Sequence, residues 1–84
     1  MTTQILEEKD FYRTADLSLA AMICLFHPLE AIERKNSRKA HFLFKRSGEL
    51  DTLIEVYWRG ESRVEPQAYF NALRVIKTRL YGEE

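Results

Sequence analysis

Few side chains in this 84-residue sequence suit acid–base, nucleophilic or metal chemistry, because it holds one cysteine and two histidines. Cys24 lies in an apolar run, where we expect a buried structural thiol. A single cysteine has no partner for an intramolecular disulfide and cannot build a cysteine-based zinc site. His27 stands beside Pro28 and His41 stands in an alternating segment, so we expect both histidines to be structural or solvated.

Motifs that mark catalytic sites are missing from the sequence as well. It contains no strained Gly-x-Ser-x-Gly turn and no phosphate-binding glycine loop. The three glycines are isolated, and each stands where a helix is predicted to begin or end. We therefore expect no enzymatic activity, no catalytic residues, no metal ion and no cofactor.

The distribution of charge is the more informative pattern. The 13 Lys and Arg balance the 13 Asp and Glu, for a formal net charge of +0. Cations nevertheless gather in one stretch that contains no acid: Arg34, Lys35, Arg38, Lys39, Lys45 and Arg46. Such a cluster can lie along a phosphate backbone and displace its condensed counterions, with little sequence preference. The competing interpretation is a solvated cluster that protects a strand edge and is partly neutralised by Glu30 and Glu33.

A second candidate surface lies on the predicted last helix, where Phe70, Arg74, Lys77 and Tyr81 follow one stripe. Aromatic rings can stack on bases while Arg74 and Lys77 meet phosphates. The favoured alternative places Phe70 and Tyr81 on the flank of the hydrophobic core. Trp58, near another helix end, is expected to close the core rather than to anchor a partner.

The elements that must position these residues begin after a flexible tail at 1–10, and a single globular domain is predicted over 11–82. A short strand is expected from Phe11 to Arg13. Thr14 is expected to cap a helix over 15–26, with Asp16 in its first turn. That helix is apolar on nearly all sides, so we expect it to be the central core helix, ended by Pro28.

A β-hairpin is predicted next, although 29–35 also has the propensity for a helix. Apolar and polar residues alternate over 40–45, which indicates a half-buried strand that needs a partner. The nearest partner is 29–35, joined through a turn at Asn36-Ser37. Such a hairpin puts the cations of 34–39 at its tip and Lys45-Arg46 at its other end.

Two helices complete the chain. Ser47 can cap the first, with Glu49 in its first turn, and Gly60 ends it. The second begins at Pro66, presents a core stripe and ends near Gly82. That core stripe comprises Tyr69, Leu73, Ile76 and Leu80. The predicted fold is a small two-layer α+β domain of order β-α-β-β-α-α, with helices packed on one face of a short antiparallel sheet.

The sequence also bears on the compartment. The apolar run 19–26 spans about 12 Å as a helix, against about 30 Å of bilayer core, so we expect no membrane partner. Mixed and acidic residues precede it where a secretory signal needs a basic leader. The lone cysteine suits a reducing compartment, and we expect a cytoplasmic protein.

Several short motifs between about Phe11 and Tyr81 resemble a small family of uncharacterised bacterial, archaeal and phage proteins, classed as a domain of unknown function. They are Thr14-Ala15-Asp16-Leu17, Leu19-Ala20-Ala21, Phe42-Leu43-Phe44, Trp58, Val64-Glu65-Pro66, Tyr69, Asn71-Ala72-Leu73, Lys77 and Arg79-Leu80-Tyr81. The family commonly has a glycine after the first helix and an aspartate before the proline, where this chain has His27-Pro28 and Glu65. The resemblance implies no activity.

The leading hypothesis is a non-catalytic binding module that contacts nucleic acid through the basic hairpin, assisted by Arg74 and Lys77. The alternative is a protein-interaction or self-associating domain, such as a homodimer, in which the basic hairpin meets an acidic surface of another protein or another copy.

Overall fold

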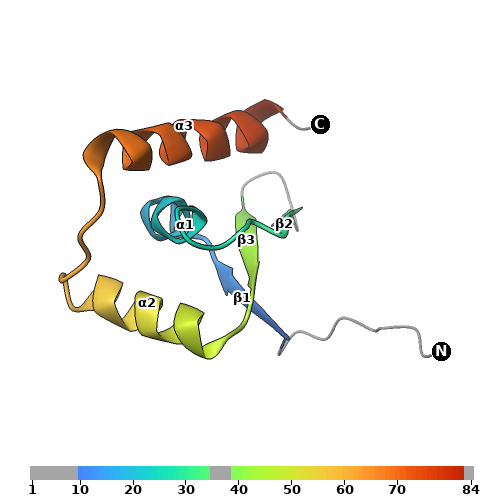
Figure 1. Cartoon of the computed structure of the whole chain (residues 1–84). Coiled ribbons are helices and arrows are strands. Elements are labelled where there is room, and N and C mark those ends of the chain that lie inside the picture. Colours follow the sequence, from blue (N-terminus) through green and yellow to red (C-terminus); the bar gives the residue numbers. More distant parts are fainter. Residues whose placement is uncertain (1–9, 35–38, 83–84) are drawn as a thin grey trace.

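The computed structural model describes residues 10–34 and 39–82. The elements follow the predicted order: β1 (Phe11–Thr14), α1 (Leu17–Cys24), β2 (Ala31–Arg34), β3 (Ala40–Lys45), α2 (Gly48–Trp58) and α3 (Pro66–Gly82). The α+β fold and its β-α-β-β-α-α order are therefore confirmed (Figure 1). None of the helices in the described ranges combines the length and apolarity needed to span a bilayer.

The three strands form one antiparallel sheet of order β1-β3-β2. The segment that could have been helix or strand is the strand β2, which pairs with β3 as the alternation over 40–45 predicted. Thr14 and Ile32 both lie opposite Phe42, and residues that face each other across a ladder point to the same side. The predicted turn at Asn36-Ser37 lies outside the described residues.

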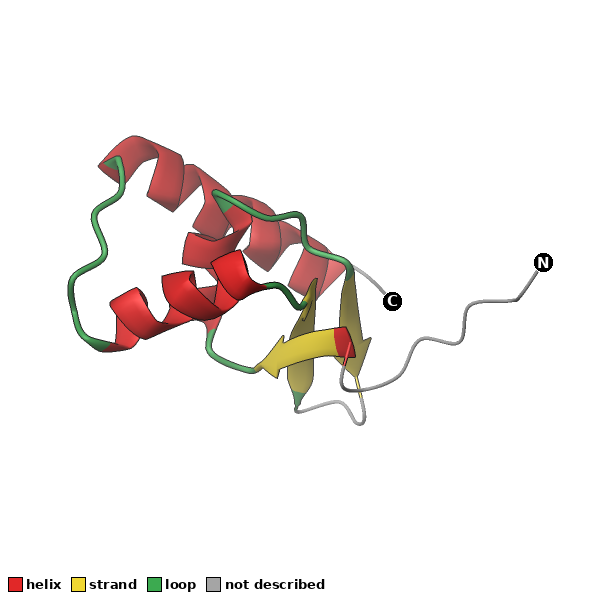
Figure 2. Cartoon of the chain, turned by 60° about the horizontal axis from the view of Figure 1, so that its bottom comes forward, coloured by secondary structure: helices red, strands yellow, loops and turns green. Residues whose placement is uncertain are grey.

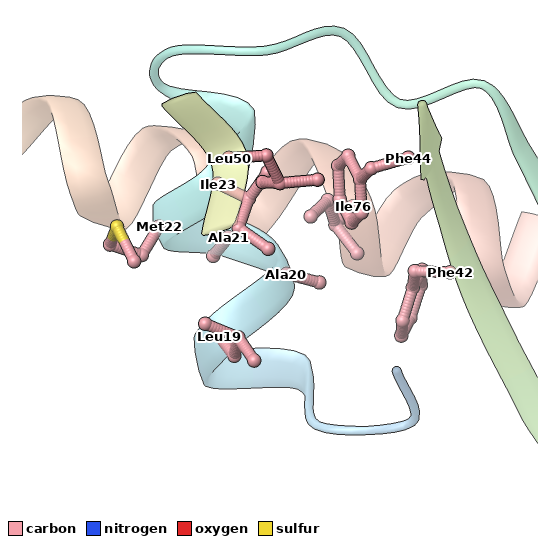
Figure 3. Close-up of a cluster of buried hydrophobic side chains, with 9 residues drawn as sticks. All are labelled: Leu19, Ala20, Ala21, Met22, Ile23, Phe42, Phe44, Leu50 and Ile76. Atoms are coloured by element: carbon pink, nitrogen blue, oxygen red, sulfur yellow. The ribbon is translucent and has the colours of Figure 1, made fainter. Parts of the chain in front are cut away.

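All three helices lie on one side of this sheet (Figure 2). The sheet face that carries Phe42 and Phe44 meets α1, which supplies five consecutive buried residues from Leu19 to Ile23. Leu50 of α2 and Ile76 of α3 complete the buried cluster (Figure 3). The expectation that α1 is the central core helix is confirmed.

The start of α1 differs from the prediction. Asp16, not Thr14, is the N-cap, and its carboxylate accepts a hydrogen bond of 3.2 Å from the Leu19 N–H. Thr14 is held in β1 opposite Phe42, so its hydroxyl reaches only the Asp16 N–H, at 3.0 Å. Asp16 is the last residue in an extended conformation before the helix, which is the backbone geometry that a cap requires.

The end of α1 also differs, because the helix stops at Cys24 rather than at residue 26. The amides of Phe26 and His27 still donate to the Ile23 carbonyl, at 2.9 and 2.8 Å, in a closing turn. Pro28 disfavours the helical conformation at His27 and so ends the helix early.

The other two helices begin and end as predicted. The Ser47 hydroxyl accepts a 3.0 Å hydrogen bond from the Leu50 N–H, and Gly60 follows α2 with a φ of 73°, a left-handed conformation that glycine adopts without a Cβ clash. Before α3, the Glu65 carboxylate accepts a hydrogen bond of 2.7 Å from the Ala68 N–H, so Glu65 caps this helix. The Tyr69 hydroxyl donates to the Ser18 carbonyl at 3.2 Å and ties α3 to α1.

Adjacent residues of α3 provide a test of this packing. Ile76 is 2% exposed and belongs to the core, whereas Val75 is 52% exposed. Replacing Ile76→Ala should lower the free energy of unfolding by about 2–5 kcal/mol, because it removes buried carbons and leaves a cavity. Val75→Ala should change it by about 0.5 kcal/mol or less. Urea denaturation followed by circular dichroism measures both, and equal losses would contradict the packing.

Candidate nucleic-acid interface

Arg34 and Lys39 line a pocket at the end of the hairpin, together with residues from α1 and α3. Its volume is about 320 Å³. Leu17, Phe42 and Leu80 form the apolar part of its lining, and Tyr81 at the end of α3 completes it. We call this cavity the hairpin pocket. Figure 1 shows how the C-terminal end of α3 reaches the hairpin.

Strand alternation aims Arg34 at this pocket. Arg34 lies opposite Ala40 and shares the helix-facing side of the sheet with Ile32 and Phe42. Its neighbour Glu33 points to the opposite side of the sheet. There the Glu33 carboxylate accepts two hydrogen bonds from Arg13 of β1, from Nε at 2.9 Å and from Nη2 at 3.3 Å. The carboxylate next to Arg34 in sequence is thus engaged with a different guanidinium.

Glu30, the other acid expected to neutralise the cluster, lies at the far end of the sheet. It lines a second pocket of about 310 Å³ with Lys45 and Arg46. Arg46 there pairs with Asp51 of α2, with Nη2 3.8 Å from Oδ1. The far end of β3 therefore holds cations that stand beside carboxylates.

The predicted site residues accordingly fall into two groups. About 17 Å of strand separates the two ends of β3. Arg34 and Lys39 lie at one end, and Lys45 and Arg46 lie at the other. Lys35 and Arg38 lie outside the described residues, and Arg74 and Lys77 are exposed on α3.

The aromatic residues of α3 are exposed, contrary to the expectation that they lie on the flank of the core. Phe70 and Tyr81 are 61% and 73% exposed, so they do not belong to the flank of the core. The core stripe confirmed on α3 centres on buried Ile76, and the stripe from Phe70 to Tyr81 runs about 100° further round the helix. Trp58 is likewise 62% exposed and does not close the core, because Tyr57 beside it takes the inward position.

Charge is segregated between the helices, a feature that the sequence interpretation missed. α3 contains Arg74, Lys77 and Arg79 and no carboxylate, whereas α2 contains Glu49, Asp51 and Glu55 and no cation. α1 lies between them, so the acidic and basic helices cover different sides of the domain (Figure 1). The signal was present in the sequence as a 17-residue stretch without Asp or Glu.

The residues suited to chemistry remain dispersed. His27 lines the second pocket, whereas His41 lies on the sheet face that carries Glu33. Within the described ranges no three His, Cys, Asp or Glu side chains are grouped to hold a metal ion. The pKa of the Tyr57 hydroxyl is raised, mainly by burial and to a smaller extent by the negative charge of Asp16.

The half-buried thiol of Cys24 lies in an environment that disfavours the thiolate. Burial raises its pKa, and the positive charge of Arg79 lowers it by a smaller amount. A raised pKa leaves less thiolate at neutral pH than a free cysteine has, so the thiol should be a weak nucleophile.

This environment can be tested by alkylation with iodoacetamide across pH. The midpoint of the rate profile should lie above that of a free cysteine, at about 8.5. Arg79→Gln should move the midpoint further up, because it removes the charge that favours the thiolate. The urea-unfolded chain is the control and should return the midpoint of a free cysteine. A folded-state midpoint below that of the unfolded chain would contradict the assignment.

Comparison with known proteins identifies the family but no function. No curated protein and no solved structure matches the chain. The model of a family described as a domain of unknown function, DUF5659, matches residues 9–82. This match covers every helix and strand described above and confirms the resemblance found in the motifs. The chain therefore belongs to the DUF5659 family.

Proposed function

We propose that this domain is a non-catalytic binding module that contacts nucleic acid where the hairpin pocket meets the basic side of α3. One observation carries the proposal: Arg34 and Lys39 share a pocket with Tyr81, the last side chain of the exposed stripe on α3. Arg74 and Lys77 lie on the α3 stripe that ends in Tyr81 at this pocket, so two cationic segments far apart in the sequence lie toward one end of the domain. Lys45 and Arg46 are not part of it.

The local charge balance supports a polyanionic partner. Among the residues that the structure describes, no carboxylate lines the hairpin pocket, and neither Glu33 nor Glu30 lies beside Arg34 in it. Arg74 and Lys77 continue the positive surface along α3, about 5 Å apart along the helix axis. Cations at such spacings can meet successive phosphates and release their counterions.

Binding to nucleic acid should therefore be measurable and steeply dependent on salt. Fluorescence anisotropy with short single-stranded and duplex DNA and RNA, at several salt concentrations, measures both the affinity and the slope. The double substitution Arg34→Ser with Lys39→Ser should weaken binding roughly tenfold or more and flatten the slope by about 1.4 for a single strand or 1.8 for a duplex.

A charge-matched control separates this surface from a general loss of positive charge. The double substitution Lys45→Ser with Arg46→Ser removes the same charge at the far end of β3 and should affect binding much less. Thermal unfolding checks that both variants fold. Absence of binding at low salt, or equal losses in the two double variants, would contradict the proposal.

The segregation of charge favours a second candidate function, self-association. The acidic α2 of one copy can pair with the basic α3 of another, and a two-fold axis would repeat this contact reciprocally.

Self-association of this kind should respond to salt. Light scattering should show dimers at low salt that dissociate as the charges are screened. The double substitution Glu49→Gln with Glu55→Gln should weaken the dimer, whereas it should strengthen or leave unchanged the binding of a polyanion. A monomer at every salt concentration would refute this candidate and leave the nucleic-acid proposal standing.

A further inference from the structure

We infer that the hairpin pocket receives an unpaired base, so that the domain binds single-stranded nucleic acid in preference to a duplex. This inference rests on the proposed nucleic-acid function and adds to it the form of the ligand. It is carried by the shape and chemistry of the pocket, whereas the proposed function is carried by charge.

The pocket is concave and half open, and its lining is mixed, with somewhat more apolar than polar surface. Its volume of about 320 Å³ lies at the lower end of the range of about 300–1,000 Å³ that small-molecule sites occupy. Leu17, Phe42 and Leu80 present carbon surface to it. A charged phosphate gains nothing from contact with these carbon atoms, whereas the flat face of a base can pack against them.

Tyr81 gives the pocket an aromatic ring available for stacking. It is 73% exposed although it neighbours Leu80, which packs against the core. Its ring therefore contributes little to the core and remains available to a ligand. Stacking on an aromatic ring accepts every base, which suits a binding site without a hydrogen-bonding code.

The cations at the pocket provide the complementary contact. Arg34 and Lys39 are exposed side chains that line the same cavity as the apolar residues. A nucleotide with its base in the pocket can place its phosphate against these cations, and the strand can continue along Arg74 and Lys77. A mononucleotide would make only the first part of these contacts.

A base of a duplex can enter the pocket only at a cost in free energy. The bases of a duplex are paired and stacked, so a base must be unpaired and unstacked before it can turn outward into the pocket. A single strand has bases that are already free to enter. The cations at the pocket and on α3 therefore attract single strands and duplexes alike, whereas the pocket strengthens the binding of the single strand only.

Oligonucleotides of equal length separate stacking from charge, because the abasic strand carries the same phosphates as the single strand, whereas the duplex carries about twice as many. Anisotropy at one moderate salt concentration compares a single strand, its duplex and an abasic single strand, which keeps the phosphates and lacks the bases. The single strand should bind about 5- to 150-fold more tightly than the abasic strand, the factor expected for stacking of one base. A mononucleotide should compete poorly.

Variants of Tyr81 test the ring itself. Tyr81→Ala should remove most of the preference for the single strand over the abasic strand, and Tyr81→Phe should retain it because the ring persists. Trp58→Ala is the matched control, an exposed aromatic on α2 that does not line the pocket. Thermal unfolding confirms that each variant folds.

The outcomes distinguish the two proposals. Equal, salt-dependent binding of single-stranded, duplex and abasic oligonucleotides would overturn the base pocket and leave phosphate binding in place. Tyr81→Ala with an undiminished preference would also overturn it. No binding of any oligonucleotide would overturn the nucleic-acid function itself, and the inference with it.

Discussion

The burial of α1 is the constraint on which the rest of the structure depends. Five consecutive residues, Leu19 to Ile23, are buried, so every side of the helix at that level needs a cover. The sheet provides one cover and α2 and α3 provide the others, through Leu50 and Ile76. Ala20 and Ala21 leave room for close approach of these neighbours. Because each cover comes from a different part of the chain, hiding this one helix determines the whole arrangement.

The same constraint explains why charge is distributed as it is. Helices that cover different sides of α1 face different sides of the domain, so the acids of α2 and the cations of α3 are segregated. Strand alternation produces a similar separation within the sheet, where Glu33 and Arg34 are adjacent in sequence and lie on opposite faces. The partly exposed Arg13–Glu33 pair contributes little to stability, about 0.2–1 kcal/mol. Its larger effect is to engage the acid that is closest to Arg34 in the chain.

Local signals in the sequence were sufficient to predict the elements. The alternation over 40–45 required a partner strand, and Ser47, Gly60 and Pro66 marked helix ends by their own conformational preferences. Thr14 and Asp16 are both good caps, and only the register of β1 against β3 decides that Asp16 takes that place. Such a choice depends on tertiary pairing, which local propensity does not contain.

The candidate site was less predictable for the same reason. The sequence placed cations at a hairpin tip and more cations on the last helix, but it contained no signal that Tyr81 would reach Arg34. From the sequence, Phe70 and Tyr81 are expected on the flank of the core stripe, and Trp58 is expected to close the core. Whether a residue on the flank of a helix is buried depends on how far the neighbouring elements extend over that flank. Here the elements that pack against α2 and α3 leave Trp58, Phe70 and Tyr81 exposed.

The brevity of α1 has a consequence for how the molecule can be dissected. A helix of 8 residues is shorter than the roughly 12–15 residues at which isolated helices become even marginally stable in water. α1 therefore persists only while its covers are in place, and folding should be all-or-none rather than stepwise. A hairpin peptide or an isolated α3 would keep the charges but lose the cavity between them, so the proposed binding surface cannot be excised as a fragment that retains its shape.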